Sequence, residues 1–553
     1  MENNILKIID ETQDLVRNID GLTGSDAFEE VIKVFFTLNF IKKEINTPEE
    51  LQLLFFNDIK PNYNFFNSDK INLKELTISE LLKIFSKVDL KSEDIKGRLF
   101  EGFLGRVFTS GLGQFFTPRE IVDFMVKFLQ KNNLIPSDGY ILDPACGSAG
   151  ILIQSQDGNQ KIIGFDINER LTRVSKMNMA IHGIKDFEIY NESFLNDKDL
   201  PPISLVITNP PFGVDEKQKE ILEKFKFGVN KNKRELEILF LEKIIKVLKP
   251  GGICAIVLPD GFFNNISLKD ERKYLLDNCE IIASVDLPEN VFKSTGTGCE
   301  TGILFFRKKN KSNDEIKDFL AYKANYVGYE TQTKFAKKIS QNDLINIVND
   351  ENFTNKVKVN KLFDSFRIDG KFYLRVEMLL EKPKCELFEK SGKNINKIYK
   401  DEDLIKYVQY SDIDPVFGVI KSSTIMEKND APSRAKIVVE TNDILIPKLK
   451  QSSDKIAIVT PEYNGCVVTN GFYVIKPKEG VNVNYLFGVV RKEQIQQQLK
   501  DYSSGTIMPS IDDEFFDIIK YEKELENEET IISEKVTRVF TLINEAKKII
   551  DDL

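Results

Sequence analysis

Short apolar runs alternate with amphipathic stretches between residues 119 and 306, and this alternation restricts the possible folds more than any other feature of the sequence. The apolar runs have the length of strands and lie at 140–142, 162–165, 187–190, 204–208 and 253–258. Stretches with helical periodicity lie at 119–130, 168–182 and 234–248, and the pattern of the final strands lies at 281–306. Strands that alternate with helices form a parallel sheet covered by helices. The sequence therefore predicts an α/β core over residues 96–310.

The segments on either side of this core have different patterns. Residues 1–95 repeat apolar positions every three or four residues, which predicts an N-terminal helical domain. Residues 311–365 are polar, as in a connecting segment, and residues 366–526 return to the strand-length runs of a mixed α/β domain. Residues 527–553 predict a coiled-coil-like helix, because their apolar positions are spaced 4-3-4-3-4-3. These positions are Ile532, Val536, Val539, Ile543, Ala546, Ile550 and Leu553.

Composition excludes several kinds of site and partner. The chain has one histidine, His182, and six scattered cysteines without a CxxC pair, so neither a histidine-based catalytic site nor a metal site is predicted. Its net charge of -9 means that contact with DNA needs a locally basic groove. No apolar run approaches the roughly 20 residues of a membrane helix, and the N-terminal segment lacks the pattern of a secretory signal. We therefore expect a cytoplasmic protein.

A glycine-rich turn, Asp143-Pro-Ala-Cys-Gly-Ser-Ala-Gly150, follows one predicted strand and precedes a helix. Its glycines let a ligand approach the backbone, and the start of the helix offers unpaired N–H groups. Asp166 ends the next strand, where a carboxylate can bind two ribose hydroxyls. The turn lacks the GxGxxG pattern of dinucleotide sites, so a nucleoside-type ligand without a pyrophosphate fits better. For the turn taken by itself, a tight turn without a ligand is the alternative.

The motif Asn209-Pro-Pro-Phe212 directly follows the apolar strand SLVIT. An adenine amino group is a poor nucleophile because its lone pair is delocalised into the ring. The side-chain oxygen of Asn209 and the carbonyl of Pro210 are both acceptors that can bind the two amino hydrogens and localise this lone pair. The two prolines stiffen the loop, and Phe212 offers a face on which a base can stack. A rigid proline turn that only ends the strand is the alternative.

The order of Phe116-Thr-Pro118, Asp143–Gly150, Asp166 and Asn209–Phe212 resembles that of S-adenosylmethionine-dependent DNA adenine-N6 methyltransferases in which target recognition comes last. Over about residues 1–310 the sequence resembles the modification subunits of type I restriction systems. The stretches that carry this resemblance are IKGRLFEGFLGRVFTSGLGQFFTPREIV (95–122), ILDPACGSAGILI (141–153), LEILFLEKIIKVLKPGGICAIVLPDGFF (236–263) and LPENVFKSTGTGCETGILFFRK (287–308). The resemblance implies a Rossmann-like core that methylates the N6 amino group of an adenine flipped out of double-stranded DNA.

The resemblance also implies roles for the motif residues. Asp143 would orient the cofactor, Asp166 would bind its ribose, and Glu192 stands near the cofactor adenine, where the family usually has Asp. Cys146 is interpreted as a small turn residue, because adenine methylation forms no covalent enzyme intermediate. The implied catalytic residues are Asn209, Pro210, Pro211 and Phe212. The implied cofactor-binding residues are Gln114, Phe115, Phe116, Thr117, Pro118, Arg119, Asp143, Pro144, Cys146, Gly147, Ser148, Ala149, Gly150, Asp166, Ile167, Glu192, Ser193 and Asn209.

The region from residue 366 resembles a target-recognition domain of type I specificity subunits. The stretches that carry this likeness are YVQYSDID (407–414), NDILIPKLKQSSDKIAIV (442–459), CVVTNGFYVIKP (466–477) and SSGTIMPSI (503–511). Type I systems normally place two such domains on a separate subunit, whereas this chain carries one, followed by a heptad helix. The helix either packs on its own domain or pairs two chains, so that a homodimer presents two recognition domains to a two-part DNA site.

Several alternatives stay open at this point. The chain could be a modification subunit that is active only with separate specificity or nuclease subunits, so that a restriction subunit becomes a partner. It could also be an assembly factor with an inactive methyltransferase fold, or an enzyme that methylates a glutamine amide in a protein. The intact motifs argue against the assembly factor, and the recognition domain argues against the protein substrate. The basic stretch NKNKRE (230–235) is either a solvated loop or a contact to DNA phosphates.

Overall fold

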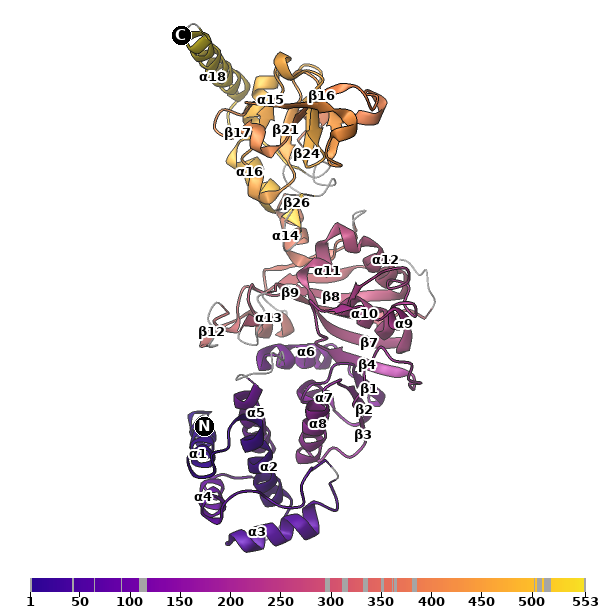
Figure 1. The fold of residues 1–553 in the computed structure, drawn as a ribbon, viewed down its shortest axis with the longest axis vertical. Helices are drawn as coiled ribbons and strands as arrows, with labels where there is room; N and C mark the ends of the chain where they lie inside the picture. The colour runs from indigo at the N-terminus through magenta and orange to yellow at the C-terminus, as the bar shows by residue number, and fades with distance from the viewer. Residues whose placement is uncertain are drawn as a thin grey trace. The chain divides into compact units, whose positions relative to one another are not determined.

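The computed structural model divides into two compact units (Figure 1). The first unit holds residues 1–259 and 273–360, and the second holds residues 260–272 and 361–553. The structure describes residues 2–41, 44–63, 65–90, 92–108, 117–293, 299–310, 317–331, 337–349, 353–360, 362, 366–379, 385–501, 503–504, 510–511 and 519–551. Among these residues, no helix is both long and apolar enough to cross a membrane.

A nine-stranded sheet forms the centre of the first unit, in the order β13-β10-β8-β9-β7-β4-β1-β2-β3. Its strands are β1 (Asp138–Asp143), β2 (Asn159–Phe165), β3 (Phe187–Tyr190), β4 (Ile203–Thr208), β7 (Leu248–Pro259), β8 (Cys279–Asp286), β9 (Thr301–Lys308), β10 (Phe319–Lys323) and β13 (Lys356–Val359). The strands from β3 to β7 are parallel, whereas β9 runs antiparallel to both of its neighbours. This arrangement confirms the prediction of a Rossmann-like α/β core.

Helices accompany the strands of this sheet. They are α6 (Arg119–Lys131), α7 (Gly150–Ser155), α8 (Glu169–Ile181), α9 (Lys219–Leu222), α10 (Leu236–Val247), α12 (Lys269–Asn278) and α13 (Asp343–Asn349). On α6 the apolar residues recur at three- and four-residue spacing, so one face is buried. Two of them, Phe124 and Phe128, contact the Phe305 ring of β9, with ring centroids 6.1 and 4.3 Å apart. The remaining strands of the unit form two pairs, β5 (Asp215–Glu216) with β6 (Arg234–Glu235) and β11 (Val327–Tyr329) with β12 (Lys338–Asn342).

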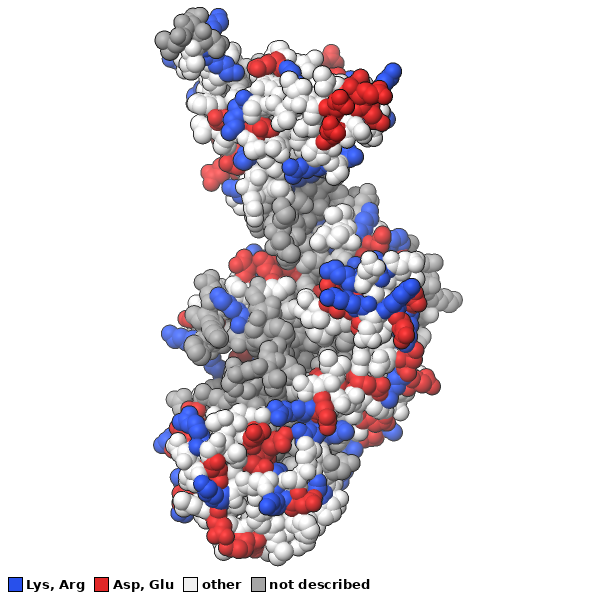
Figure 2. All heavy atoms as spheres, viewed as in Figure 1, with Lys and Arg blue, Asp and Glu red and all other residues white. Residues whose placement is uncertain are grey.

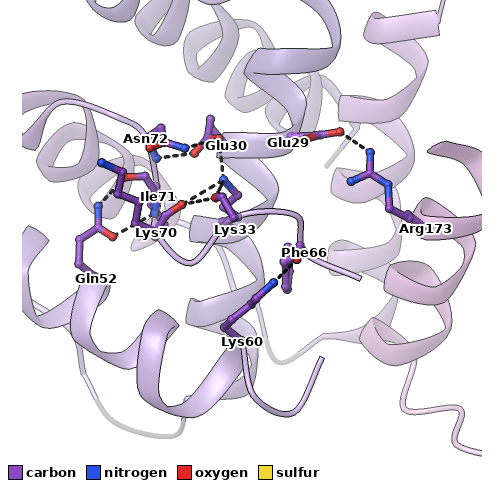
Figure 3. Close-up of polar contacts among 11 residues, drawn as sticks. Glu29, Glu30, Lys33, Gln52, Lys60, Phe66, Lys70, Ile71, Asn72 and Arg173 are labelled. Atoms are coloured by element: carbon purple, nitrogen blue, oxygen red, sulfur yellow. Dashed lines mark hydrogen bonds and ion pairs between the residues drawn. The ribbon is translucent and has the colours of Figure 1, made fainter. Parts of the chain in front are cut away.

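The N-terminal segment is helical and shares a core with α8. Its helices are α1 (Glu2–Asp20), α2 (Gly24–Phe40), α3 (Pro48–Leu54), α4 (Glu75–Phe85) and α5 (Glu93–Phe108). Leu171, Val174 and Met177 of α8 belong to the same apolar cluster as these helices. Figure 3 shows the ion pair that joins Glu29 of α2 to Arg173 of α8, with 2.7 Å between the charged atoms. The helical block is therefore anchored on the helix that follows Asp166.

A segment that the sequence predicts as a connection contributes to the central sheet. Residues 311–365 include β10 and β13, which pair antiparallel at one edge. In β13 the buried residues Val357 and Val359 alternate with Lys356 and Lys358. This polar composition is typical of an edge strand with one solvated face, which explains why the pattern resembles that of a connecting segment.

The second unit contains two larger sheets, a two-stranded pair of β25 with β26, and two apolar clusters. One of the larger sheets has the order β14-β24-β21-β22-β18-β17 and the other β15-β20-β23-β16-β19. The strands are β14 (Phe388–Lys390), β15 (Lys393–Asn394), β16 (Leu404–Val408), β17 (Ile413–Asp414), β18 (Val419–Ile420), β19 (Thr424–Glu427), β20 (Ala435–Val438), β21 (Ile444–Pro447), β22 (Ala457–Ile458), β23 (Val467–Thr469), β24 (Phe472–Pro477), β25 (Ser503–Ser504) and β26 (Ser510–Ile511). The helices are α11 (Asp260–Asn264), α14 (Gly370–Leu379), α15 (Val483–Val490), α16 (Glu493–Asp501) and α18 (Glu528–Asp551).

The last helix, α18, packs on its own domain only over its first part. Ile532 and Val536 lie against Gly488 of α15, and the rings of Phe540 and Phe487 are 5.9 Å apart. Further along the helix apolar side chains are exposed, and Ile550 is 68% exposed. The predicted heptad positions are therefore divided between contacts with α15 and a solvated end.

Candidate active site

The three sequence motifs meet at the carboxyl ends of adjacent parallel strands. Asp143 ends β1, Asp166 follows β2, and Asn209 follows β4. Because β4, β1 and β2 are neighbours in the sheet, the three positions share one edge. Ligands of open α/β sheets bind at this edge, where loops carry the functional side chains.

The glycine-rich turn after β1 is held by hydrogen bonds and open on one side. The buried carboxyl of Asp143 accepts from the Thr208 hydroxyl at 2.6 Å and from the Ala145 N–H at 3.0 Å. Gly147 and Ala149 have positive φ angles of 52° and 65°. A Cβ added at Gly147 would meet no atom within 4 Å, so the space above the turn is open to a ligand.

Asp166 joins the second strand end to this turn. Its Oδ2 accepts from the Gly147 N–H at 3.1 Å, and its Oδ1 accepts from the Asn168 N–H at 2.8 Å. Each carboxylate oxygen has a further lone pair, so the group can still accept from vicinal hydroxyls. The next side chain, Ile167, is 78% exposed, and an apolar surface beside a carboxylate suits the flat base of a nucleoside.

Burial shifts the proton affinity of both carboxyls. Desolvation raises the pKa of Asp143 to about 7, against the opposing hydrogen bonds from Thr208 and Ala145, and the nearby negative charge of Asp166 adds to the rise. Burial also raises the pKa of Asp166, while its two backbone hydrogen bonds oppose the shift. A cationic ligand at this edge would stabilise the ionised form of both groups.

We expect Asp143→Asn to remove a pH dependence of stability. Because the folded state holds the Asp143 proton up to about pH 7, whereas an unfolded Asp releases it near pH 4, wild-type stability decreases as pH rises through this window, by on the order of 4 kcal/mol. The asparagine oxygen can keep both hydrogen bonds, since both end on Oδ1. Urea unfolding between pH 4.5 and 7.5 should show that the free energy of unfolding of the variant increases relative to that of the wild type as pH rises. The same pH dependence of the free energy of unfolding in both proteins would contradict the raised pKa of Asp143.

The side chain of Asn209 is oriented through its amide nitrogen, whereas its amide oxygen accepts no hydrogen bond from the described residues. The Nδ2 group donates to the Thr117 hydroxyl oxygen at 3.0 Å. The Oδ1 atom is buried and has no hydrogen-bond partner among the residues that the structure describes. An unpaired buried acceptor costs roughly 1–3 kcal/mol, so the site favours a ligand that brings a donor.

The remainder of the proline loop lies in the apolar core. Pro210 is buried, and Phe212 is 8% exposed. The ring of Phe212 meets the ring of Phe292 edge to face, with centroids 5.9 Å apart and an angle of 76°. Stacking of a base on Phe212 stays a prediction that requires more of this ring to become accessible.

Two polar side chains of α8 that the motifs do not include also support the turn. The Ser175 hydroxyl donates to the Gly147 carbonyl, and the Asn178 amide donates to the Ser148 carbonyl at 2.9 Å. Both residues are buried, as is Thr172, and the other buried residues of this helix are apolar. A pair of polar residues spaced by three on the buried face of a helix is the signal that could have identified them.

The other predicted residues vary in their surroundings. Glu192 forms an ion pair with Lys198 at 2.7 Å and is partly exposed, as is Ser193. Cys146 is buried, and burial raises the pKa of its thiol, which agrees with a small turn residue. Thr117, Pro118 and Arg119 lead into α6. Three predicted residues lie outside the described part of the chain, namely Gln114, Phe115 and Phe116.

The chain is similar in sequence to known methylase subunits. The type I restriction enzyme EcoEI methylase subunit of Escherichia coli is 30% identical over 321 residues, which cover 53% of this chain and 61% of that protein. The EcoKI methylase subunit of E. coli K12 is 30% identical over 254 residues, which cover 40% of this chain and 46% of that protein. The chain thus spans about half the length of these relatives.

The fold has counterparts among solved structures. The type I restriction-modification system methyltransferase subunit from Streptococcus thermophilus superposes with a TM-score of 0.50 at 17% identity, covering 65% of this chain and 95% of that chain. The family model described as N-6 DNA Methylase matches residues 91–369, just over half of the sequence. This match contains β1, β2 and β4 and the motif residues at their ends. The chain therefore belongs to the N-6 DNA methylase family.

Proposed function

We propose that this chain is a site-specific DNA methyltransferase that transfers a methyl group from S-adenosylmethionine to the N6 amino group of an adenine in double-stranded DNA, as part of a restriction-modification or related defence system. The observation that carries the proposal is the buried, unpartnered Oδ1 of Asn209 beside a glycine-rich turn. An amino group supplies the hydrogen that this acceptor lacks. Because N6 is paired inside the duplex, the adenine must be flipped out.

The residues at the sheet edge fit the cofactor. S-adenosylmethionine supplies a methyl group on a positively charged sulfur. Asp166 would accept from the ribose hydroxyls, and Ile167 would cover the adenine ring, since it is 78% exposed beside that carboxylate. The negative charge of Asp166, and that of Asp143 once it is ionised, favours a cation above the turn.

The chain itself would activate the nucleophile. Asn209 Oδ1 and the Pro210 carbonyl would accept the two hydrogens of the adenine amino group, which localises its lone pair on nitrogen. The Thr117 contact at 3.0 Å fixes the orientation of the Asn209 amide before the base arrives. The transfer would break the S–CH3 bond and release S-adenosylhomocysteine, and the methylated nitrogen would then lose one of its protons to solvent. Catalysis by such fixed dipoles requires neither a metal ion nor a general base of unusual pKa.

We infer that residues 366–526 are a single target-recognition domain fused to the enzyme. The two larger sheets and two apolar clusters of the second unit support a separately packed module. Figure 2 shows Asp and Glu side chains gathered on one side of this unit, so we expect DNA to approach another face. A modification subunit that is active only with separate specificity and nuclease subunits is the alternative, because the relatives are named as subunits of type I restriction enzymes.

We also infer that two chains pair through α18. Its first part contacts α15, whereas the heptad residues Val539 and Ile550 are 42% and 68% exposed. A heptad seam with an exposed end suits an isologous helix pair, which would present two recognition domains to DNA.

We expect Ile550→Glu to convert the dimer to a monomer, because it places a charge in the seam, whereas Ile549→Glu should leave the dimer intact. The two side chains are matched, with exposures of 68% and 65%, but only Ile550 occupies a heptad position. Sedimentation velocity measures the difference. A monomeric wild type, or equal effects of both substitutions, would disprove pairing through this seam.

The function is tested by expressing the chain alone in a host without DNA methylation and mapping N6-methyladenine by single-molecule sequencing. Methylation at one motif would support a self-sufficient enzyme, and a two-part motif would support the dimer. Unmodified DNA that becomes methylated only after specificity subunits are added would favour the alternative.

A further inference from the structure

The catalytic loop continues directly into a short antiparallel hairpin. Strands β5 and β6 form its arms. Their pairing extends by one step, because the Leu236 N–H donates to the Val214 carbonyl at 2.9 Å. This bond places Gly213, the residue that follows the loop, close to the first turn of α10, which contains Glu237.

Glu237 is an acidic residue at a buried position, where an apolar side chain would be expected. It is 7% exposed, and its Oε2 has no hydrogen-bond partner among the described residues. Burial raises the pKa of Glu237 to about 7, while the backbone N–H of Glu237 itself and, to a smaller extent, that of Gly213 act in the opposite direction by favouring the carboxylate. The carboxyl therefore faces the end of the catalytic loop and titrates near neutral pH.

Charged neighbours on the hairpin act on Glu237 in opposite senses. The negative charge of Glu235 raises its pKa, and the positive charge of Arg234 lowers it. Arg234 and Glu235 also form an ion pair with each other, at 3.3 Å. Lys233 is paired with Asp215 at 2.8 Å on the exposed side of the hairpin.

We propose that Glu237 is a positioning residue for the Asn209–Phe212 loop. Its carboxylate holds the Gly213 N–H and so fixes the end of the loop in the conformation that presents Asn209 Oδ1 to the target amino group. No atom lies within 4 Å of a Cβ built at Gly213, so side-chain packing does not restrain this residue. A hydrogen bond to a charged carboxylate is roughly twice as strong as one to a neutral acceptor, so ionisation tightens the loop. This inference rests on the proposed methyltransferase function.

The test compares Glu237→Gln, which keeps the shape and removes the charge, with Glu235→Gln on the same hairpin. The second variant should keep kcat at pH 8 while its pH profile moves to lower pH, because the negative charge of Glu235 raises the pKa of Glu237. We expect the Glu237 variant to lose about tenfold in kcat at pH 8, with KM for cofactor and DNA within twofold. Its kcat should also rise less steeply between pH 6 and 8 than that of the wild type. Asp143 titrates in the same range in all three proteins, so only differences from the wild type report on Glu237.

A second measurement depends neither on catalysis nor on the variants. Hydrogen exchange of the Gly213 amide in the wild type, corrected for intrinsic exchange, should slow as pH rises through 7, while the amides in the middle of α10 do not change. A wild-type pH profile in the Glu237→Gln variant, or pH-independent protection of Gly213, would overturn the positioning role. A wild type that shows this protection but never methylates DNA would instead count against the proposed function.

Discussion

Asn209→Ala should lower the rate of DNA methylation by about 10³-fold while the affinity for S-adenosylmethionine changes by no more than about twofold. The substitution removes the buried Oδ1 that has no partner within the described chain and with it one of two acceptors for the adenine amino group. Loss of one preorganised polar contact to the reacting group typically costs 10²–10³ in kcat. Single-turnover methylation at saturating cofactor measures the loss, and calorimetry measures cofactor binding.

Thr117→Val serves as the graded control for this experiment. It removes the 3.0 Å hydrogen bond that orients the Asn209 amide but keeps Asn209 Oδ1 as an acceptor for the adenine amino group. We therefore expect a smaller loss of methylation rate, about tenfold. DNA binding should persist in both variants, because neither side chain belongs to the recognition domain. Near-normal turnover by Asn209→Ala would remove the mechanism, and a larger loss in Thr117→Val than in Asn209→Ala would show that Thr117 acts in another way.

The central sheet is predictable because its strands are continuous apolar runs. The strand β4 is buried over its whole length, and β1 and β2 are buried and largely apolar towards their carboxyl ends, so these runs predict strands without knowledge of the fold. Asp143, Asp166 and Asn209 come directly after these runs, and parallel strands end at one edge, so their proximity follows from the sequence. The hydrogen-bond partners of Asp143 and Asn209, which are Thr208 and Thr117, could not be predicted in this way, because these contacts depend on the order of strands in the sheet.

Other features depend on contacts that sequence periodicity does not record. The edge strand β13 reads as a polar connection because lysines occupy its solvated face. The heptad spacing of α18 cannot indicate that Ile532 and Val536 contact α15 while Ile550 is exposed. Likewise, an aromatic residue after two prolines predicts a stacking surface, whereas the ring of Phe212 packs against Phe292 in the apolar core.

Asp166→Asn should weaken the binding of S-adenosylmethionine by about 10–100-fold. The carboxylate at the end of β2 has one lone pair on each oxygen beyond its contacts to Gly147 and Asn168. Replacing it with an amide removes one acceptor and the negative charge, and a hydrogen bond to a charged group contributes about 1.5–3 kcal/mol. The affinity for adenosine alone should fall by a similar factor, because the ribose is common to both ligands.

Glu192→Gln distinguishes a ribose contact from a general loss of negative charge at this edge. Glu192 is predicted to lie near the cofactor adenine and not at the ribose, and it is already paired with Lys198 at 2.7 Å and partly exposed. Its neutralisation should therefore weaken the binding of the cofactor by less than threefold. Thermal unfolding of both variants would show whether the contact to Gly147 is lost with the carboxylate. Equal losses of cofactor affinity in the two variants would indicate that the negative charge at this edge of the sheet matters, and not a specific contact to the ribose. An unchanged affinity in Asp166→Asn would remove the ribose assignment, since no acceptor at the end of β2 would then be needed to hold the nucleoside.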